Sequence, residues 1–252
     1  VIAIPSAFVK ESLNKLTTDI SSKFVISGIK GLIPGENMIM GEFLNMKYGI
    51  PFEFIGVLAG PCHAEEVALE RLSFLTVACP DEANALEFAK LIQCNYIRAG
   101  ITDDIWGTEF SSVMKNIIAI AAGIAHGLMY GDNFLAVLIS NAIQEIKRFV
   151  DGVHPIDRDI KSSVYLGDLL VTAYSQFSRN RTFGNMIGKG YSVKTAQLEM
   201  NMIAEGYYAA KTIREINEKY KINLPICEAV YQICYMNQPP KKEILKLIDK
   251  LN

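Results

Sequence analysis

Lys115 lies in the middle of a long apolar helical pattern between Thr108 and Asn133. Apolar side chains such as Met114 and Ile118 recur at helical spacing and cover most of the circumference, which is typical of a buried helix. A buried lysine needs partners for its ammonium, and burial lowers the pKa of a lysine because it disfavours the charged form. Such a lysine can exchange protons near neutral pH. The alternative is a lysine whose stem lies along the helix while its charge stays in water.

Two glycine-containing turns follow predicted strands. In Gly28–Gly31 the glycines let a ligand approach the backbone, and Lys30 offers a cation; the alternative is a solvated loop lysine. The turn Gly60–Ala64, which contains Cys62, leads into a predicted helix whose first amides can face an anion. The alternative there is a purely structural turn between strand and helix.

A basic turn, Ser178-Arg179-Asn180-Arg181, precedes another predicted helix. Arginine matches phosphate oxygens with paired, charge-assisted hydrogen bonds, so the turn favours a phosphate site; the alternative is a solvated basic turn. Asp168 follows Gly167 and, on local pattern alone, caps a helix. Taken together, these residues suit an enzyme that acts on a small phosphorylated or carboxylated molecule.

The elements that position these residues change character near residues 102–106. Strand and helix patterns alternate up to about residue 103, which predicts an α/β domain (1–103) with a mainly parallel sheet. Ligands of such sheets bind beyond the carboxyl ends of the strands. The rest of the chain (104–252) predicts an all-helical domain. The expected strands lie at residues 1–5, 23–27, 51–59, 74–80 and 95–101.

Composition excludes several classes of protein. The chain has 252 residues, half of them apolar, and a net charge of −2, so it lacks the basic footprint of a nucleic-acid-binding protein. The apolar run Ile117–Ala125 is too short for a membrane span, and Pro5 interrupts the apolar start, so we expect no signal peptide. Five scattered cysteines indicate reduced thiols and a cytoplasmic location, and the three histidines lack metal-ligand spacing.

Several motifs, taken in order, resemble the NAD(P)-dependent glycerol-3-phosphate dehydrogenases of the bacterial type. Together they span the chain and are specific as a set, although the shorter ones would be weak alone. The matching segments are Met114-Lys115-Asn116 with IIAIAAGIAHGL, Gly131-Asp132-Asn133, Gly167-Asp168-Leu169 through Thr172, Ser178–Arg181 with Phe183-Gly184, Ala204-Glu205-Gly206, Leu224-Pro225-Ile226 and Glu228–Tyr231.

The resemblance implies a Rossmann-like α/β N-terminal domain and an all-α C-terminal domain. It also implies reversible reduction of dihydroxyacetone phosphate to sn-glycerol 3-phosphate by NADH or NADPH, which supplies glycerol phosphate for phospholipids. The family opens with a glycine-rich turn that receives the dinucleotide phosphates, and no such turn occurs here. We therefore expect the first part of the Rossmann domain to be missing from this chain, and cofactor binding by the chain as written to be impaired.

The resemblance also assigns roles to residues. Lys115 is the catalytic acid and base, and Lys30 stabilises the developing oxyanion and touches the nucleotide. Residues expected to orient Lys115 and the substrate hydroxyls are Asn116, Asp168 and Thr172. Residues expected at the substrate are Gly60 and Cys62, with Ser178, Arg179 and Asn180 at its phosphate. Residues expected at the cofactor are Ala64, Ile203 and Glu205, with Arg179 reaching it as well.

Two residues depart from the family pattern, and several alternatives stay open. Cys62 stands where the family usually has Ser or Thr, and a thiol is a weaker donor; Asn141 stands where many members have Arg. The alternatives are a related reductase of another hydroxy acid, a non-catalytic phosphate-binding fragment, and an enzyme that forms a Schiff base on Lys115. The expected partner is a small-molecule substrate, and a homodimer through the helical domain is a further option.

Overall fold

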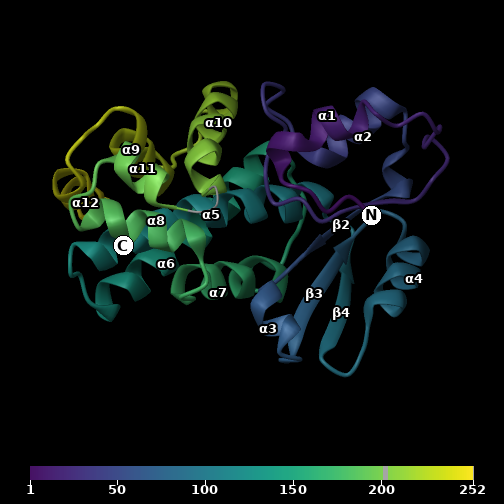
Figure 1. Cartoon of the computed structure of the whole chain (residues 1–252), viewed down its shortest axis with the longest axis horizontal. Coiled ribbons are helices and arrows are strands. Elements are labelled where there is room, and N and C mark those ends of the chain that lie inside the picture. Colours follow the sequence, from purple (N-terminus) through teal and green to yellow (C-terminus); the bar gives the residue numbers. More distant parts are fainter. Residues whose placement is uncertain (201–203, 252) are drawn as a thin grey trace. The chain divides into compact units, whose positions relative to one another are not determined.

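A sheet of four strands organises the first part of the chain in the computed structural model, which describes residues 1–200 and 204–251 (Figure 1). The strands are β1 (Val25–Ser27), β2 (Ile55–Ala59), β3 (Ser73–Ala78) and β4 (Ile97–Thr102), and they lie in that order. The pairs β1–β2 and β3–β4 are parallel, whereas β2 and β3 are antiparallel. The prediction of a mainly parallel sheet is therefore confirmed, with one antiparallel pair at its centre.

The predicted first strand, residues 1–5, is wrong as a strand. Ile2 forms only an isolated parallel bridge to Ser27, with its N–H donating to the Ile26 carbonyl over 2.7 Å. Proline has no N–H for a ladder, so Pro5 limits how far this pairing can extend.

Short helices connect the strands of this unit, and α4 packs against β3 and β4 (Figure 1). Its first turn is capped by Asp81, whose side chain accepts a hydrogen bond from the Asn84 N–H over 2.8 Å. Val77 and Ile26 pack with Ala85 in the core between sheet and helix. The helices are η1 (Ser6–Phe8), α1 (Val9–Leu13), α2 (Met40–Tyr48), η2 (Phe52–Phe54), α3 (Ala64–Ala68) and α4 (Glu82–Ile92).

Helices make up the rest of the chain, which confirms the predicted fold class. The first is α5 (Ile105–Gly127), in which every residue from 107 to 125 is buried. The others are α6 (Asp132–Val153), the π-helix η3 (Ser163–Gly167), α7 (Asp168–Tyr174), α8 (Arg179–Gly188), α9 (Val193–Glu199), α10 (Glu205–Tyr220), α11 (Pro225–Tyr235) and α12 (Pro240–Ile248). Within the described residues, no helix has the length and apolar character needed to cross a membrane.

The chain separates into two compact units. One comprises Val1–Ser112 with Asp157–Asp168, and the other comprises Val113–Ile156 with Leu169–Asn252. Helix α5 thus begins in the first unit and continues in the second. The predicted division into domains 1–103 and 104–252 stays a prediction.

Helices α5 and α8 cross at backbone contact in the second unit. A Cβ added to Gly184 would lie 2.1 Å from the Ile120 carbonyl oxygen, so only glycine fits at this crossing. Because the two backbones touch, the residues just before α8 are held at a fixed distance from the helix that carries Lys115.

Candidate active site

Lys115 is buried in α5, with 4% of its surface exposed. The alternative in which its charge stays in water is therefore wrong, and the predicted burial is confirmed. Ser111 and Ser112 on the preceding turn are buried as well, and the Ser111 hydroxyl donates to the Thr108 carbonyl over 3.1 Å. A buried ammonium on a rigid helix, next to small polar groups, is suited to proton transfer to a bound molecule.

Asn116 lies beside the start of α10. A Cβ added to Gly206 would lie 2.4 Å from the Asn116 carbonyl oxygen, so α10 begins in direct contact with the backbone of α5. The Gly206 N–H also donates to Oδ1 of Asn180 over 2.9 Å. The structure thus brings together, within one unit, three motifs that are far apart in sequence.

The turn before α8 is held by its own hydrogen bonds. Ser178 is the N-cap of α8, and its hydroxyl oxygen accepts from the Arg181 N–H over 3.3 Å. Ser178 and Asn180 are buried, whereas Arg179 is exposed. A cationic side chain at a helix start, flanked by a fixed hydroxyl and amide, is suited to bind a phosphate.

Asp168 and Thr172 lie one helical turn apart on α7. Asp168 is the first residue of α7 and Thr172 follows four positions later; both are buried, with exposed fractions of 1% and 5%. Asp168 has helical backbone angles, φ −70° and ψ −33°, and continues directly from η3, so the prediction that it is the N-cap of a helix is wrong.

The first unit holds the predicted residues of the two strand-end turns. Strands β1 and β2 are parallel, so their carboxyl ends, and with them Lys30 and Gly60, lie at the same edge of the sheet. Gly60 has a φ of +130°, and a Cβ there would lie 2.8 Å from the Phe74 carbonyl oxygen. Ala64 is exposed at the start of α3.

Charges converge on Cys62 in this unit. Burial raises the pKa of the Cys62 thiol, the positive charge of Lys30 and a hydrogen bond with Ser73 act to lower it, and the carboxylate of Asp168 raises it. A Cβ added to Gly167 would lie 3.6 Å from Pro61 Cγ. Asp168 and Lys30 therefore both act on the Gly60–Cys62 turn.

The remaining predicted residues are less informative. Glu205 is the first residue of α10 and is half-buried. Ile203 lies outside the described residues. Asn141, the departure in α6, donates to the Val137 carbonyl over 3.0 Å within its own helix.

Two buried glutamates cap distant helices and were not predicted from the sequence pattern. Glu109 on α5 accepts the N–H groups of Met40 and Gly41 at the start of α2, over 3.2 and 2.9 Å. Glu145 on α6 accepts those of Ile226 and Cys227 at the start of α11, over 2.8 and 2.9 Å. Each satisfies N–H groups that have no partner within their own helix. No local signal marks such caps, because donor and acceptor are distant in sequence.

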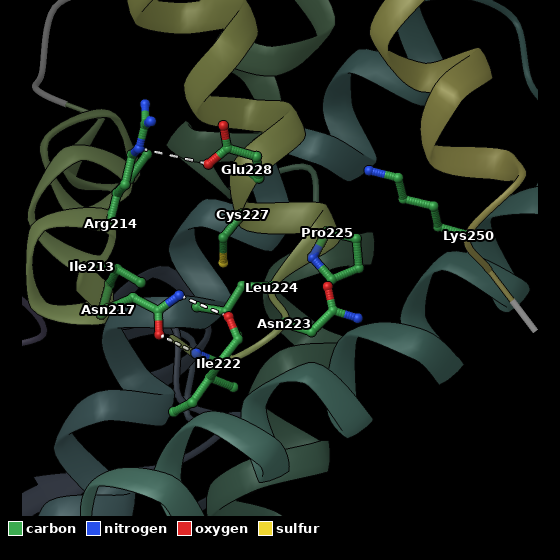
Figure 2. A pocket seen from close by; sticks show the side chains of 11 residues that line it. Ile213, Arg214, Asn217, Ile222, Asn223, Leu224, Pro225, Cys227, Glu228 and Lys250 are labelled. Atoms are coloured by element: carbon green, nitrogen blue, oxygen red, sulfur yellow. Dashed lines mark hydrogen bonds and ion pairs between the residues drawn. The ribbon is translucent and has the colours of Figure 1, made fainter. Parts of the chain in front are cut away.

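A pocket of about 230 Å³ opens between α10, α11 and the loop that joins them (Figure 2). Arg214 faces Glu228 across it, with 3.7 Å between Nε and Oε2. The side chain of Asn217 closes the loop through hydrogen bonds with both backbone groups of Ile222. This pocket contains none of the predicted site residues. Its lining residues are Ala210, Ile213, Arg214, Asn217, Ile222, Asn223, Leu224, Pro225, Cys227, Glu228 and Lys250.

Comparison with known proteins identifies the family. Models described as the N-terminus and the C-terminus of NAD-dependent glycerol-3-phosphate dehydrogenase match residues 1–85 and 104–245. The glycerol-3-phosphate dehydrogenase (NAD(P)+) of Limosilactobacillus reuteri is 37% identical over 257 residues, which cover 99% of this chain and 75% of the relative. That of Pelodictyon phaeoclathratiforme is 34% identical over 252 residues, which cover 99% of this chain and 76% of the relative.

A solved structure agrees with these sequence matches. The crystal structure of glycerol-3-phosphate dehydrogenase from Coxiella burnetii superposes with a TM-score of 0.90 at 28% identity, covering 97% of this chain and 75% of that one. The chain therefore belongs to the family of NAD-dependent glycerol-3-phosphate dehydrogenases, as its motifs predicted.

Proposed function

We propose that this chain reduces dihydroxyacetone phosphate to sn-glycerol 3-phosphate with NADH or NADPH, and that it also catalyses the reverse reaction. The observation that carries the proposal is the burial of Lys115 on α5, in the unit that also holds the capped, arginine-bearing start of α8. One feature is suited to move a proton and the other to hold a phosphate.

The sheet edge of the first unit fits an anionic dinucleotide. Lys30 and the turn Gly60–Cys62 follow parallel neighbouring strands, and dinucleotides bind beyond such strand ends. The donor set there combines the ammonium of Lys30 with open backbone at Gly28. Among the residues that the structure describes, a Cβ added to Gly28 would meet only the Ile2 carbonyl, at 3.7 Å. When bound, the nicotinamide supplies a hydride to the central carbon of the substrate and accepts it in the reverse reaction.

Lys115 provides the proton. As a C–H bond forms at the carbonyl carbon, the C=O π bond breaks, and the Lys115 ammonium gives its proton to the carbonyl oxygen. The neutral amine regains a proton from water, and in the reverse direction it takes the proton from the hydroxyl. Lys30 stabilises the negative charge that develops on the oxygen.

The phosphate group is assigned to the start of α8. Oδ1 of Asn180 already accepts from Gly206, so its NH₂ group is the part of the amide that can donate to a phosphate oxygen. Arg179 adds charge and paired donors there, and its side chain also reaches the cofactor. Ser178 completes this phosphate set.

The other predicted residues orient the reacting groups or contact the cofactor. Asn116, Asp168 and Thr172 orient Lys115 and the substrate hydroxyls. Residues assigned to line the substrate are Gly60 and Cys62, and those assigned to the cofactor are Ala64, Ile203 and Glu205. The proposal further includes a cytoplasmic location, a homodimer formed through the helical unit, and a product used as the glycerol phosphate backbone of phospholipids.

The test is oxidation of NADH, and separately of NADPH, by the protein at its natural length. Dihydroxyacetone phosphate is compared with unphosphorylated dihydroxyacetone and with hydroxypyruvate, a carboxylate analogue. We expect kcat/KM for the phosphorylated substrate to exceed the others by roughly 100-fold or more, because a site built for a charged group rejects analogues that lack it. Preference for hydroxypyruvate would indicate a hydroxy-acid reductase, and no turnover of any substrate would indicate a phosphate-binding protein without catalysis.

A further inference from the structure

The carboxylate of Asp104 is the centre of a buried hydrogen-bond network in the first unit. Its Oδ2 accepts from Arg158 Nε over 2.8 Å and from the Tyr165 hydroxyl over 2.6 Å. Its Oδ1 accepts from the Gly107 N–H over 2.8 Å. The side chains of Asp104 and Arg158 are each only 2% exposed.

The network favours the charged form of the Asp104 carboxylate. Burial alone would raise the pKa of Asp104, but the hydrogen bonds from Arg158, Tyr165 and Gly107 outweigh this and lower it. Burial, together with the hydrogen bond to Asp104, raises the pKa of Tyr165, so its hydroxyl keeps its proton and donates. The buried Asp104 carboxylate accepts hydrogen bonds from three residues, and a network of this kind restricts the geometry of its members.

The network joins two parts of the chain that carry proposed site residues. Asp104 immediately precedes α5 and caps its first turn through Gly107. Tyr165 lies in the π-helix Ser163–Gly167, and Asp168 follows that helix directly. Single-turn π-helices occur frequently at functional sites.

Asp168 in turn lies near the turn that follows β2. The negative charge of the Asp168 carboxylate raises the pKa of the Cys62 thiol. A Cβ added to Gly167 would lie 3.6 Å from Pro61 Cγ. The hydrogen bond from Tyr165 to Asp104 therefore holds the π-helix that ends at Gly167, and Asp168 follows it beside the Gly60–Cys62 turn.

We propose that Asp104, Arg158 and Tyr165 form a positioning network that holds the Asp168 carboxylate in place against the Gly60–Cys62 turn during turnover. This inference rests on the proposed function, in which Asp168 orients reacting groups. The three network residues are positioning residues, because they act through Asp168 and are not assigned a contact with the substrate.

Tyr165→Phe is the variant that isolates this role. It removes one hydroxyl and leaves Asp104 paired with Arg158, whereas removing either partner of the buried ion pair would leave an uncompensated charge. Tyr235→Phe is the matched control, because the Tyr235 hydroxyl also donates one part-buried hydrogen bond, to the Tyr207 carbonyl over 2.9 Å.

The kinetic test compares both variants at natural protein length. We expect Tyr165→Phe to lower kcat for dihydroxyacetone phosphate on the order of tenfold, since small misplacements of orienting groups cost this much or more. KM should stay within about threefold, and Tyr235→Phe should leave kcat unchanged. In an Asp168→Asn background, Tyr165→Phe should lower kcat by no more than about twofold, because residues that act through one group are not additive.

A second readout does not depend on activity. Because the Asp168 carboxylate raises the pKa of Cys62, its displacement in Tyr165→Phe should speed alkylation of Cys62 by iodoacetamide, measured by mass spectrometry. Unchanged Cys62 labelling together with unchanged kcat would overturn the inference, and so would equal fold-losses of kcat in both backgrounds. If the wild-type protein does not reduce dihydroxyacetone phosphate, the proposed function fails, and the labelling rate still decides whether Tyr165 positions Asp168.

Discussion

The backbone N–H of Gly206 donates to Oδ1 of Asn180 over 2.9 Å, and this hydrogen bond ties the first turn of α10 to the first turn of α8. The same glycine lies against the backbone of α5, where an added Cβ would be 2.4 Å from the Asn116 carbonyl oxygen. Three helix segments with proposed site residues thus meet at one position where a side chain does not fit.

Gly206→Ala should therefore destabilise the protein. The carbonyl of Asn116 belongs to a buried helix and cannot move aside cheaply, so we expect the free energy of unfolding to fall by about 1–3 kcal/mol. Urea unfolding measures this change. Gly100→Ala is the control, because among the described residues no atom lies within 4 Å of a Cβ at Gly100. Equal stability of the two variants would show that the α5–α10 contact is looser than described.

Glu109 should make stability depend on pH. Burial raises its pKa to about 8, against an ordinary value of 4.5, although the N–H groups of Gly41 and Met40 act to lower it. The folded state therefore binds this proton where the unfolded state has lost it. The contribution to stability is complete below about pH 4.5 and is lost as pH rises through about 8.

The variant Glu109→Gln separates this contribution from the other titrating groups. At pH 5 the folded wild type holds Glu109 as the neutral acid, whose hydroxyl oxygen can still accept an N–H, whereas the NH₂ group of glutamine cannot. The variant should therefore be less stable than wild type at pH 5 by on the order of 1–3 kcal/mol. This difference in the free energy of unfolding should become smaller toward pH 8, because the unfolded wild type then has Glu109 ionised and the stabilising effect of its raised pKa is being lost. Urea unfolding across this range measures it, with exposed Glu218→Gln as the control; a difference independent of pH would contradict the prediction.

Arg179 should contribute to binding more than to chemistry. Hydrogen bonds to a charged group are worth about 1.5–3 kcal/mol, so Arg179→Ala should raise KM for dihydroxyacetone phosphate roughly 10- to 100-fold with little change in kcat. The KM of Arg179→Lys should lie between those of wild type and Arg179→Ala, because lysine keeps the charge but loses the paired donors. Arg98→Ala is the control, since the exposed Arg98 side chain donates a hydrogen bond to the Cys94 carbonyl. An unchanged KM for Arg179→Ala would remove this residue from the phosphate site.

Cys62 should react slowly with alkylating agents and should be protected by substrate. The thiolate is the reactive form, and burial raises the pKa of Cys62, whereas Cys94 is exposed. We expect iodoacetamide near neutral pH to label Cys94 before Cys62. Dihydroxyacetone phosphate should slow only the labelling of Cys62, as followed by mass spectrometry. If the substrate slows the labelling of both Cys62 and Cys94, or of neither, Cys62 does not line the substrate site.

The features that could be predicted from the sequence are those with local signals. The burial of Lys115 follows from the apolar pattern of its own helix, and the cap at Asp81 follows from its place before α4. The family motifs added the grouping of site residues that spacing alone could not supply.

Contacts between residues that are far apart in the sequence could not be predicted from such local signals. Asp104 and Arg158 are 54 residues apart, and Glu109 caps a helix that begins 69 residues earlier. The antiparallel pairing of β2 and β3 was also not predicted, because a strand pattern does not report the direction of its neighbour. Such features depend on where folded elements meet.

The most direct test of the account is the turnover of a Lys115→Met variant with dihydroxyacetone phosphate and NADH. Methionine fills most of the buried space of the lysine stem but cannot donate a proton. Lys147→Met, at an exposed ion pair with Asp151 on α6, is the control. We predict that Lys115→Met loses kcat by roughly 100- to 10,000-fold while remaining folded, because general acid catalysis contributes about this factor. A folded Lys115→Met protein with wild-type kcat would contradict the assignment of Lys115 as the proton donor.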